Sequence, residues 1–539
     1  MVSFIHNVFF HTVLFVMAAL NKTAAPPCPL DYYSTDPIQL SPWKVWMMSE
    51  AVRQNLIGHN VVSKYTNDVN TDGMSPQAAE LMRSADVSSE SGEYLAMFWN
   101  LSAFQRQLKE AKDAFPPHFH HTVATKANPL ARIIEAAAEV GVGAEAASLG
   151  EMLQALRVQP PERVMLDSPA KTVKEIEIAL DRGVGLTIDN FQELARVDAI
   201  IRGRGVTPNQ PIGMRLNPQI GTGLLATYSV SKPWGKFGLP ANEVAKDIVS
   251  AYVARPWLSM VHCHAGSQSY TMEQIASALR LIVDIANEIN EAVRGDMSNA
   301  TPLERRERNR VKTLDIGGGL MVNFKTEENT PSLHAWAAVL KSVVPELFTG
   351  EYHVITELGR RYLAKQGVIV SKVEYVKQCG GRRVVLQHAG ADIAVRTVYK
   401  PDSWPLRATA FNRDGTVMHP VPEKITAGEL LYADIAGPCC LDDVIYPQQR
   451  PLPDVAQNDF IMLHDTGAYY HSSYSYYNMR QTPAVYAFYE PEHWNKDAEK
   501  LHADGAKGTD VPVSNGEVVF ELVRPACSVE ETMDFFASK

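Results

Sequence analysis

The sequence predicts an α/β protein, in which a (β/α)8 barrel is followed by a second, mainly β domain. Eight short apolar runs alternate with amphipathic helical patterns, and polar residues recur where those runs end, which together predict the barrel. Helical periodicity fades after about residue 372, which predicts the β domain. The 539 residues, 45% of them hydrophobic, suffice for more than one domain with a sizeable core.

Composition excludes some classes of function. The net charge of -10 gives no general electrostatic attraction to nucleic acid or to anionic lipid. The six cysteines include no Cys-x-x-Cys spacing, which indicates a reducing compartment and no structural zinc or other metal site. Residues 8–20 are mostly apolar, but they are too few to span a bilayer comfortably and lack a basic start. We therefore expect a cytoplasmic protein.

The N-terminal part is expected to differ from the rest. Residues 1–92 should form an extension that packs partly on the β domain, because 21–92 is rich in Pro, Ser, Asn and Asp and only 44–56 is amphipathic. The barrel domain is expected over 93–372. It should begin with a strand at 93–100 and a helix at 101–115.

The repeating part of the chain supplies the eight strands. They are expected at 122–126, 143–147, 163–166, 185–188, 211–216, 260–264, 313–316 and 354–357. Helices are expected between them, among others at 130–140, 150–156, 173–182, 191–202 and 272–293. Strands that alternate with helices pair in parallel through right-handed crossovers, and eight such units close a barrel.

Active sites of such barrels lie at the carboxyl ends of the strands. Here those ends carry Lys126, Glu145, Asp167, Asp189, Arg215, His264, Gly317, and Glu357 with Arg360. Taken singly, His264 or Arg215 could be a satisfied core residue or a solvated one. Their recurrence at eight ends predicts a site.

The stretch Ala124-Thr125-Lys126-Ala127-Asn128-Pro129 offers a lysine where a strand ends. An amine held half out of water there can be partly neutral and form a Schiff base with an aldehyde such as pyridoxal phosphate. An ordinary surface lysine is the competing interpretation.

The last two strand ends predict a phosphate site. Gly317, Gly318 and Gly319 can approach an anion with their amides, and Arg360 adds a guanidinium. Three glycines alone could also be a flexible turn. The basic run at 305–310 has acidic neighbours and no interleaved aromatics, so we expect a solvated loop there instead of a nucleic-acid site.

The β domain is expected over residues 373–539. Its strands should lie at 373–375, 383–387, 429–435, 459–463 and 484–488. Two loops between strands carry Gly437-Pro438-Cys439-Cys440 and Asp465-Thr466-Gly467-Ala468-Tyr469, and could face a partner.

In combination these motifs resemble the fold-type III pyridoxal-phosphate decarboxylases, the family that includes diaminopimelate and ornithine decarboxylases. The resemblance covers about residues 94–490. It includes the lysine segment, His264-Ala265-Gly266-Ser267-Gln268, the glycine loop, Glu357-Leu358-Gly359-Arg360 and the two C-terminal loops. It implies an alanine-racemase-like TIM barrel, a pyridoxal 5′-phosphate cofactor, decarboxylation of an amino acid, and a homodimer in which the cysteine and tyrosine loops complete the partner's site.

The resemblance also implies residue roles. Lys126 would hold the cofactor, His264 would stack on its ring and Glu357 would pair with its pyridine nitrogen. The phosphate would be bound by Ser267, Gly317, Gly318, Gly319, Arg360 and Tyr469, and the cofactor site would be lined by Glu145 and Arg215. Cys440 would return a proton to the α-carbon, and Cys439 is the less favoured donor.

Departures from the family pattern bear on the substrate. Leu441 and His388 stand where relatives that take diamino acids keep acidic residues for a distal ammonium, whereas Arg396 stands where an arginine receives a distal carboxylate. An unpaired buried ammonium would cost on the order of several kcal/mol. We therefore expect a substrate without a distal cationic amine. A racemase or aldolase-like pyridoxal enzyme and an inactive, regulatory relative of the decarboxylases remain the alternatives.

Overall fold

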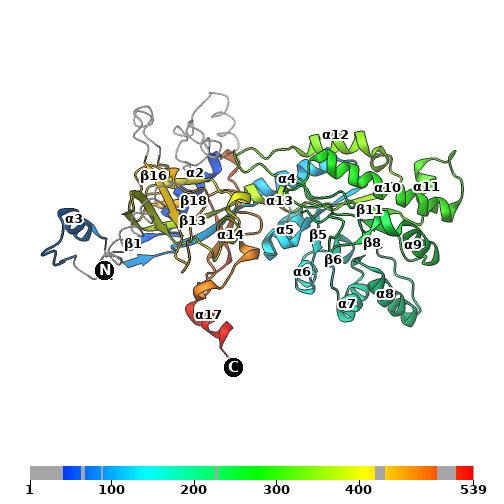
Figure 1. The fold of residues 1–539 in the computed structure, drawn as a ribbon, viewed down its shortest axis with the longest axis horizontal. Coiled ribbons are helices and arrows are strands. Elements are labelled where there is room, and N and C mark those ends of the chain that lie inside the picture. The colour runs from blue at the N-terminus through cyan, green and yellow to red at the C-terminus, as the bar shows by residue number, and fades with distance from the viewer. Residues whose placement is uncertain are drawn as a thin grey trace, which may run out of the picture.

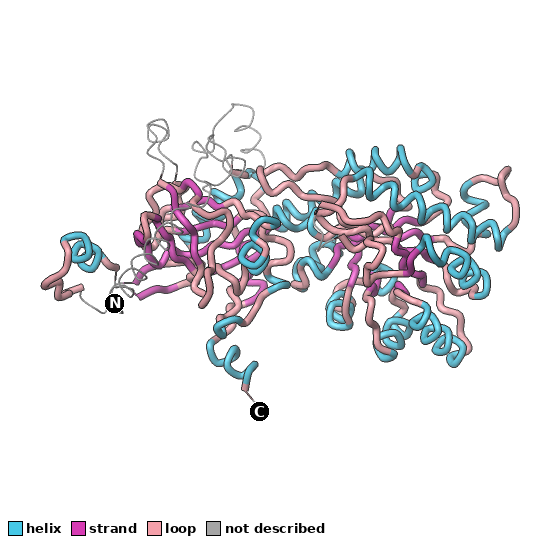
Figure 2. Tube along the Cα trace, viewed as in Figure 1, coloured by secondary structure: helices cyan, strands magenta, loops and turns pink. Residues whose placement is uncertain are grey.

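The chain forms two lobes joined side by side. A computed structural model describes residues 40–61, 67–86, 89–224, 229–418, 431–494 and 518–537. One lobe is a barrel surrounded by helices and the other is built mainly from strands (Figure 1). Figure 2 shows the strands gathered in two separate groups, one in each lobe.

The first lobe is a closed, eight-stranded parallel barrel, as the sequence predicts. Its strands are β4 (Phe119–Ala124), β5 (Gly143–Ala146), β6 (Val164–Asp167), β7 (Gly185–Ile188), β8 (Ile212–Asn217), β10 (Met260–His262), β11 (Thr313–Asp315) and β12 (His353–Glu357). They pair in sequence order, and β12 pairs with β4, which closes the barrel. The two-residue strand β9 (Leu239–Pro240) pairs in parallel with the last two residues of β8.

Helices cover the outside of this barrel. They are α4 (Leu101–Ala114), α5 (Ala131–Glu139), α6 (Leu149–Ala155), α7 (Val173–Arg182), α8 (Phe191–Arg204), α9 (Ala241–Ala254), α10 (Met272–Arg294), α12 (Leu333–Val343) and α13 (Arg360–Leu363). Local signals fix their ends: Thr172 and Glu175 form a capping box at the start of α7, and Gly183 ends it in the left-handed conformation. Because helices cover the strands, both faces of most strands are buried, which explains their apolar runs.

The basic run at 305–310 is not a loop. Its first residues belong to α11 (Pro302–Arg308), capped by Thr301 and Glu304, and Arg305 pairs with Glu351 at 2.8 Å. The expectation of a solvated loop was therefore wrong for most of this run, because a capping box and a carboxylate from the loop before β12 stabilise a helical turn.

The second lobe is a twisted, mostly antiparallel sheet. Its path is β17 (Arg450–Pro451), β16 (Tyr432–Ala436), β14 (Arg382–Gln387), β13 (Gly367–Cys379), β3 (Leu95–Asn100), β19 (Ala484–Phe488) and β20 (Phe520–Arg524). Strand β18 (Phe460–Leu463) pairs with both β13 and β15 (Ala408–Phe411). Two helices accompany it, α14 (Val395–Tyr399) and α17 (Val529–Phe536).

The boundary between the lobes differs from the expected one. Strand β3 lies between β13 and β19, so residues 95–100 belong to the second sheet and not to the barrel. Strand β13 also begins at Gly367, before the expected boundary at 372. Every residue of β3 is buried, and a short apolar strand carries no signal of which sheet it joins.

The N-terminal extension contributes α2 (Pro42–Arg53), β1 (His59–Val61), α3 (Pro76–Ser84) and β2 (Ser89–Ser91). On α2, buried Trp46, Met47 and Met48 pack into a cluster with Phe98 and Phe488 of the second sheet. Among the described residues no helix is both long and apolar enough to cross a membrane. The apolar stretch at 8–20 lies outside the described residues.

Candidate active site

Strand ends of the barrel and a loop of the second lobe converge on one cavity. Its lining includes Ala124, Lys126, His264, Ser267, Gly319, Leu320, Glu357, Leu358, Gly359, Arg360, Arg361 and Tyr469. Parallel strands place the residues that follow them at one end of the barrel. The cavity therefore joins the lysine segment, the glycine loop and the arginine of the predicted site.

Lys126 lies in the 3-10 turn η2 (Thr125–Ala127) directly after β4. Its ammonium forms a close ion pair with the fully buried carboxylate of Glu145, from the end of β5. Burial lowers the pKa of Lys126, but the carboxylates of Glu145 and Glu357 outweigh it and hold the pKa above its ordinary value. The amine is thus charged in the free chain. The expectation of a partly neutral amine was wrong, because the sequence does not show how many carboxylates surround it.

Glu357, at the end of β12, faces two further buried groups. Its carboxylate lies 3.4 Å from Nε2 of His262. Burial raises the pKa of Glu357, but His262 and Lys126 reverse this effect and the pKa lies well below its usual range. Burial and the neighbouring Glu357 raise the pKa of Asp315 far above its ordinary value. One carboxyl group of this pair is therefore ionised and the other is protonated.

The glycine loop needs glycine on steric grounds. A Cβ on Gly318 would collide with the carbonyl oxygen of Glu357, and one on Gly319 with that of Gly266. Gly317 and Gly319 also have positive φ. The Gly318 amide donates a hydrogen bond of 3.0 Å to Nδ1 of His264. The glycine loop is thus held against the segment that follows β10. Burial also lowers the pKa of His264 to about 3, so its imidazole is neutral.

Arg215 and Asp167 form a buried ion pair at the same end of the barrel. The Arg215 guanidinium also stacks 4.4 Å from the ring centre of Phe237. Asp189, the remaining strand end, instead accepts a hydrogen bond from the Gly238 amide. Asp189 follows its strand as the other predicted site residues follow theirs, but its carboxylate binds the loop that contains Gly238.

His262 and Asp315 are site residues that the sequence analysis did not single out. Asp167, His262 and Glu357 offer ligand atoms within 4.8 Å of one another, in a geometry that could hold a metal ion. Arg215 and Lys126 nevertheless stand beside these carboxylates and compete with a cation. His262 stands two residues before His264, and this spacing was the available signal, since residues two apart face the same side of a strand.

Two arginines share one aromatic wall. The guanidinium carbons of Arg360 and Arg396 each lie 4.4 Å from the ring centre of Tyr469, and both also stack on Trp404. The amide of Tyr469 donates a hydrogen bond of 2.8 Å to the Ala127 carbonyl. The tyrosine loop therefore lies against the barrel of its own chain. The expectation that this loop also completes a partner's site stays a prediction, since the contacts that the structure describes are those within one chain.

The cysteine loop lies elsewhere. Cys440 is exposed, whereas Cys439 is buried, and burial with two neighbouring aspartates raises the pKa of Cys439 to about 12. Neither cysteine nor Leu441 lines the cavity that contains Lys126. His388 is also apart from that cavity, because its Nε2 lies 3.0 Å from the carboxylate of Glu374 and its ring packs on Tyr94.

The residues of the cavity can hold pyridoxal phosphate. Glu357 Oε1 is a buried carboxylate oxygen without a hydrogen-bond partner, as a protonated pyridine nitrogen would require. Lys126 supplies an amine for the aldehyde, and the glycine loop with Ser267 and Arg360 supplies donors for a phosphate. The donor set therefore fits each end of the cofactor.

Comparisons with known proteins agree with this arrangement. Residues 101–364 match the family model described as pyridoxal-dependent decarboxylase, pyridoxal binding domain. The diaminopimelate decarboxylase of Zymomonas mobilis is 28% identical over 365 residues, which are 66% of this chain and 77% of that protein. The diaminopimelate decarboxylase of Aquifex aeolicus is 24% identical over 383 residues, which are 70% and 83%.

Solved structures show the same fold. The structure of diaminopimelate decarboxylase from Helicobacter pylori with L-lysine has a TM-score of 0.64 and 21% identity, covering 85% of this chain and 99% of that one. The lysine/ornithine decarboxylase of Vibrio vulnificus with putrescine has a TM-score of 0.57 and 20% identity, covering 74% and 94%. At these identities the likeness establishes the architecture alone.

Proposed function

We propose that this chain, which belongs to the pyridoxal-dependent decarboxylase family, is a carboxy-lyase that removes the α-carboxyl group of an amino acid. One observation carries the proposal: Lys126 and the ionised Glu357 lie at strand ends that also hold the glycine loop and Arg360 in one cavity. An amine, an ionised carboxylate and donors for a phosphate lie together there, which supports the proposal.

Each group has a definite task. Lys126 would hold the cofactor's aldehyde, Glu357 would keep a negative charge near its ring nitrogen, and neutral His264 would lie beside the ring without adding a positive charge. The bound cofactor supplies an electron-accepting ring that stabilises the charge left when carbon dioxide departs. Ser267, the three glycines, Arg360 and Tyr469 anchor the phosphate, while Glu145 and Arg215 line the site. Release of carbon dioxide by the cofactor-loaded protein, without loss of optical activity from unreacted substrate, tests decarboxylation against racemisation.

The distal end of the substrate is assigned to Arg396. Its stacking on Tyr469 puts a guanidinium beside the cavity, and a guanidinium binds a carboxylate in two-point fashion. The relatives are named for diaminopimelate, whose distal end carries both an ammonium and a carboxylate, so their names do not support the exclusion of a distal ammonium. The narrower proposal is that the chain requires the distal carboxylate but not the ammonium.

Three substrates separate these requirements. Diaminopimelate carries both distal groups, 2-aminopimelate only the carboxylate, and lysine only the ammonium. We expect kcat/KM for the first two to exceed that for lysine by about tenfold or more, and Arg396→Ala to remove this advantage. A preference for lysine over 2-aminopimelate would contradict the proposal.

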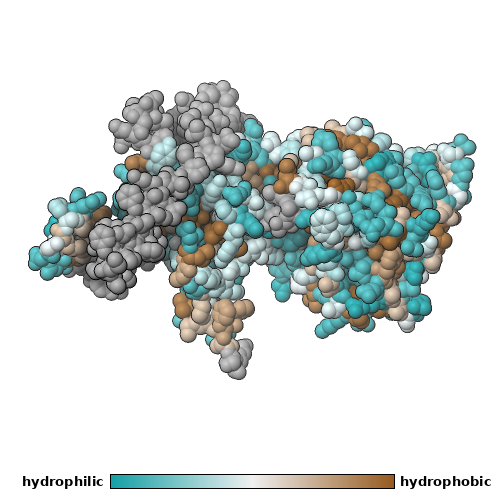
Figure 3. Space-filling view, viewed as in Figure 1, coloured by the Kyte–Doolittle hydropathy of each residue, from teal (hydrophilic) through white to brown (hydrophobic). Residues whose placement is uncertain are grey.

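A second copy of the chain is proposed to complete the site with Cys440. This thiol is exposed, and Tyr477 donates a hydrogen bond of 3.2 Å to its carbonyl. The neighbouring Tyr476 stacks on Phe535 of α17 at 4.7 Å. The part of the lobe that carries α17 is coloured mostly apolar in Figure 3. It exposes Val529, Met533, Phe535 and Phe536 at 52%, 54%, 65% and 55%. An apolar surface beside an exposed functional thiol fits an interface between copies.

Mixing of inactive chains tests the shared site. Lys126→Ala and Cys440→Ala chains should each be inactive or strongly impaired as homodimers, since one lacks the amine and the other the thiol that protonates the α-carbon. A mixture refolded together should recover about a quarter of the wild-type activity, because half the dimers are mixed and each has one intact site. The same mixture made with Cys439→Ala in place of Cys440→Ala serves as the control, and a monomeric active protein would contradict the proposal.

A further inference from the structure

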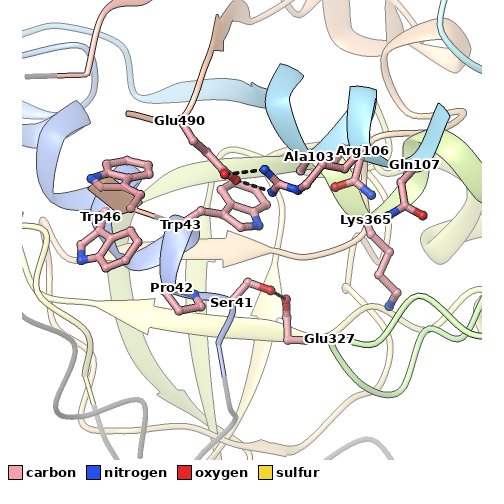
Figure 4. A pocket seen from close by; sticks show the side chains of 12 residues that line it. Ser41, Pro42, Trp43, Trp46, Ala103, Arg106, Gln107, Glu327, Lys365 and Glu490 are labelled. Atoms are coloured by element: carbon pink, nitrogen blue, oxygen red, sulfur yellow. Dashed lines mark hydrogen bonds and ion pairs between the residues drawn. The ribbon is translucent and has the colours of Figure 1, made fainter. Parts of the chain in front are cut away.

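A second cavity lies between the lobes, and its lining shares no residue with that of the candidate active site. Its volume is about 260 Å3, and its lining comes from α2, α4 and the turn η6 (Ala364–Gln366), together with single residues of other segments. We call it the junction cavity. Figure 4 shows Trp43 projecting between the Arg106–Glu490 pair on one side and the Ser41–Glu327 pair on the other. None of its lining is a residue for which a role was predicted.

Two polar groups in the lining lack partners. Gln366 is only 5% exposed, and its side-chain amide makes no hydrogen bond to any other residue that the structure describes. Trp43 is 8% exposed, and its indole N–H likewise has no acceptor within the described segments. Neither the indole nitrogen nor the amide is among the fully buried side-chain atoms without a partner, so both groups reach the open space of the cavity. Both are therefore available to donate to water or to an acceptor on a ligand inside the cavity.

The charges beside the cavity are not balanced. Lys44, Lys365 and Arg407 are buried with Glu327 and Asp465, so three cations face two carboxylates. His464 adds no further charge, because burial and its cationic neighbours lower its pKa and keep the imidazole neutral. The other charged residue pair of the lining, Arg106 with Glu490, is balanced. One buried positive charge thus remains uncompensated, which favours an anion nearby.

The rest of the lining is aromatic. Trp46 and Trp494 lie 4.9 Å apart between ring centres, and Trp43 packs 6.0 Å from Phe488. Such rings offer flat apolar area to a ligand at little entropic cost. The start of α2 also lines the cavity, and a helix N-terminus carries partial positive charge.

From these observations we infer that the junction cavity binds a small molecule with a carboxylate group and an aromatic or other apolar body. The carboxylate accepts from the Trp43 indole and the Gln366 amide near the excess positive charge, and the apolar body packs on the tryptophans. This inference does not depend on the proposed decarboxylase activity, since the two cavities share no functional residue.

Calorimetric titration of the full-length, cofactor-loaded protein tests the inference with three probes of one skeleton. The probes are 3-phenylpropionate, 3-phenylpropanamide and 3-phenylpropylammonium. We expect saturable binding of the carboxylate, about tenfold or more tighter than that of the neutral amide or the cation. Equal affinities for the three, tighter binding of the cation, or no heat of binding from any of them would overturn the inference.

Substitutions locate the bound probe. Trp43→Phe removes the indole N–H but keeps a ring, and Gln366→Leu removes the amide at similar size. Each substitution should lower the affinity for 3-phenylpropionate by about tenfold, which is the loss expected for one hydrogen bond to a charged acceptor. Trp234→Phe, at a side chain that is 77% exposed, is the matched control and should bind as wild type does. Unchanged visible absorbance of the bound cofactor shows that each variant is folded.

A carboxylate could also enter the candidate active site, and one variant separates the two positions. Arg396→Ala alters the aromatic wall of that site but leaves the junction cavity intact. If the junction cavity holds the probe, Arg396→Ala binds it as tightly as wild type does. Loss of binding in Arg396→Ala with retention in Trp43→Phe and Gln366→Leu would place the probe in the active site and overturn the inference.

Discussion

The candidate active site and the junction cavity each contain a lysine paired with a buried carboxylate, but the pKa values of the two lysines shift in opposite directions. Around Lys126, the carboxylates of Glu145, Glu357 and Asp167 stabilise the charged amine and raise the pKa of the lysine. Around Lys365, two lysines and an arginine outnumber the carboxylates, and burial lowers the pKa of that lysine to about 8. The same residue types therefore favour a cationic ring nitrogen in one place and an anion in the other.

The comparison also shows what burial alone does not decide. Desolvation lowers the pKa of both lysines, and the difference comes from the carboxylates that face each amine. Four experiments test whether the surroundings of Lys126 and Lys365 differ in this way, and the one with the largest expected effect comes first.

Removal of the active-site amine should have the largest effect. Lys126→Ala is expected to lower kcat/KM by more than about 10^3-fold, because the amine is proposed to hold the cofactor and no other lysine among the described residues lines the cavity. Borohydride reduction followed by peptide mapping should label Lys126 in the wild type only. Lys365→Ala is the matched control at the other cluster and should keep the label. A label that stays in Lys126→Ala would contradict the assignment.

Neutralisation of Glu357 should have the next largest effect. Glu357→Gln keeps the shape of the side chain but removes the charge that faces the ring nitrogen, and we expect kcat to fall by about 10^2-fold to 10^3-fold. Steady-state kinetics on cofactor-saturated enzyme measures this change. Glu327→Gln, the equivalent change at the junction cavity, should leave kcat within about twofold. Similar losses of kcat in both variants would show that the two clusters are not distinct.

At the charged cluster beside the junction cavity, removal of a carboxylate should instead lower the stability of the fold. Glu327 accepts from both Lys44 and Arg407, so Glu327→Gln leaves three buried cations with one carboxylate. We expect the free energy of unfolding to fall by about 3 kcal/mol, as for other buried pairs that lose one partner. Urea unfolding followed by tryptophan fluorescence measures the loss. A change below about 0.5 kcal/mol would mean that water already screens this cluster.

The pH dependence of stability should give an effect no larger than this one, spread over a range of pH. Lys365 is 5% exposed, and its pKa in the folded chain is about 8 instead of 10.5, so between these values the unfolded chain binds more protons. The contribution of Lys365 to the free energy of unfolding should therefore rise by up to about 3 kcal/mol as the pH goes from about 8 toward 10.5. Urea unfolding of the wild type and of Lys365→Met at several pH values isolates the contribution of Lys365. A difference between the two proteins that is constant with pH would contradict it.

Much of the barrel could be predicted from the sequence. Each strand is an apolar run bounded by turn residues, and all eight expected runs overlap observed strands within a few residues. The polar residues after these runs meet because parallel strands end at one face of a barrel. For this reason Lys126, Glu357 and the glycine loop could be placed together without any tertiary information.

Other features were beyond such reasoning. Contacts between segments hundreds of residues apart decide which sheet β3 joins. Such a contact also fixes where Tyr469 lies, because its amide binds the Ala127 carbonyl. Asp189 follows its strand as Asp167 does, but it binds the Gly238 amide instead of a site residue. Local patterns carry no information about such partners.

The sequence by itself determined the order of strands and helices, the residues at the strand ends and thereby the cofactor that those residues suit. Only the tertiary structure decided the protonation of Lys126, the pairing of Glu357 with His262 and the existence of the junction cavity. The physical reason is that periodicity and turns are local properties of the chain. A pKa or a cavity depends instead on charges and volumes brought together through space, which a linear pattern does not encode.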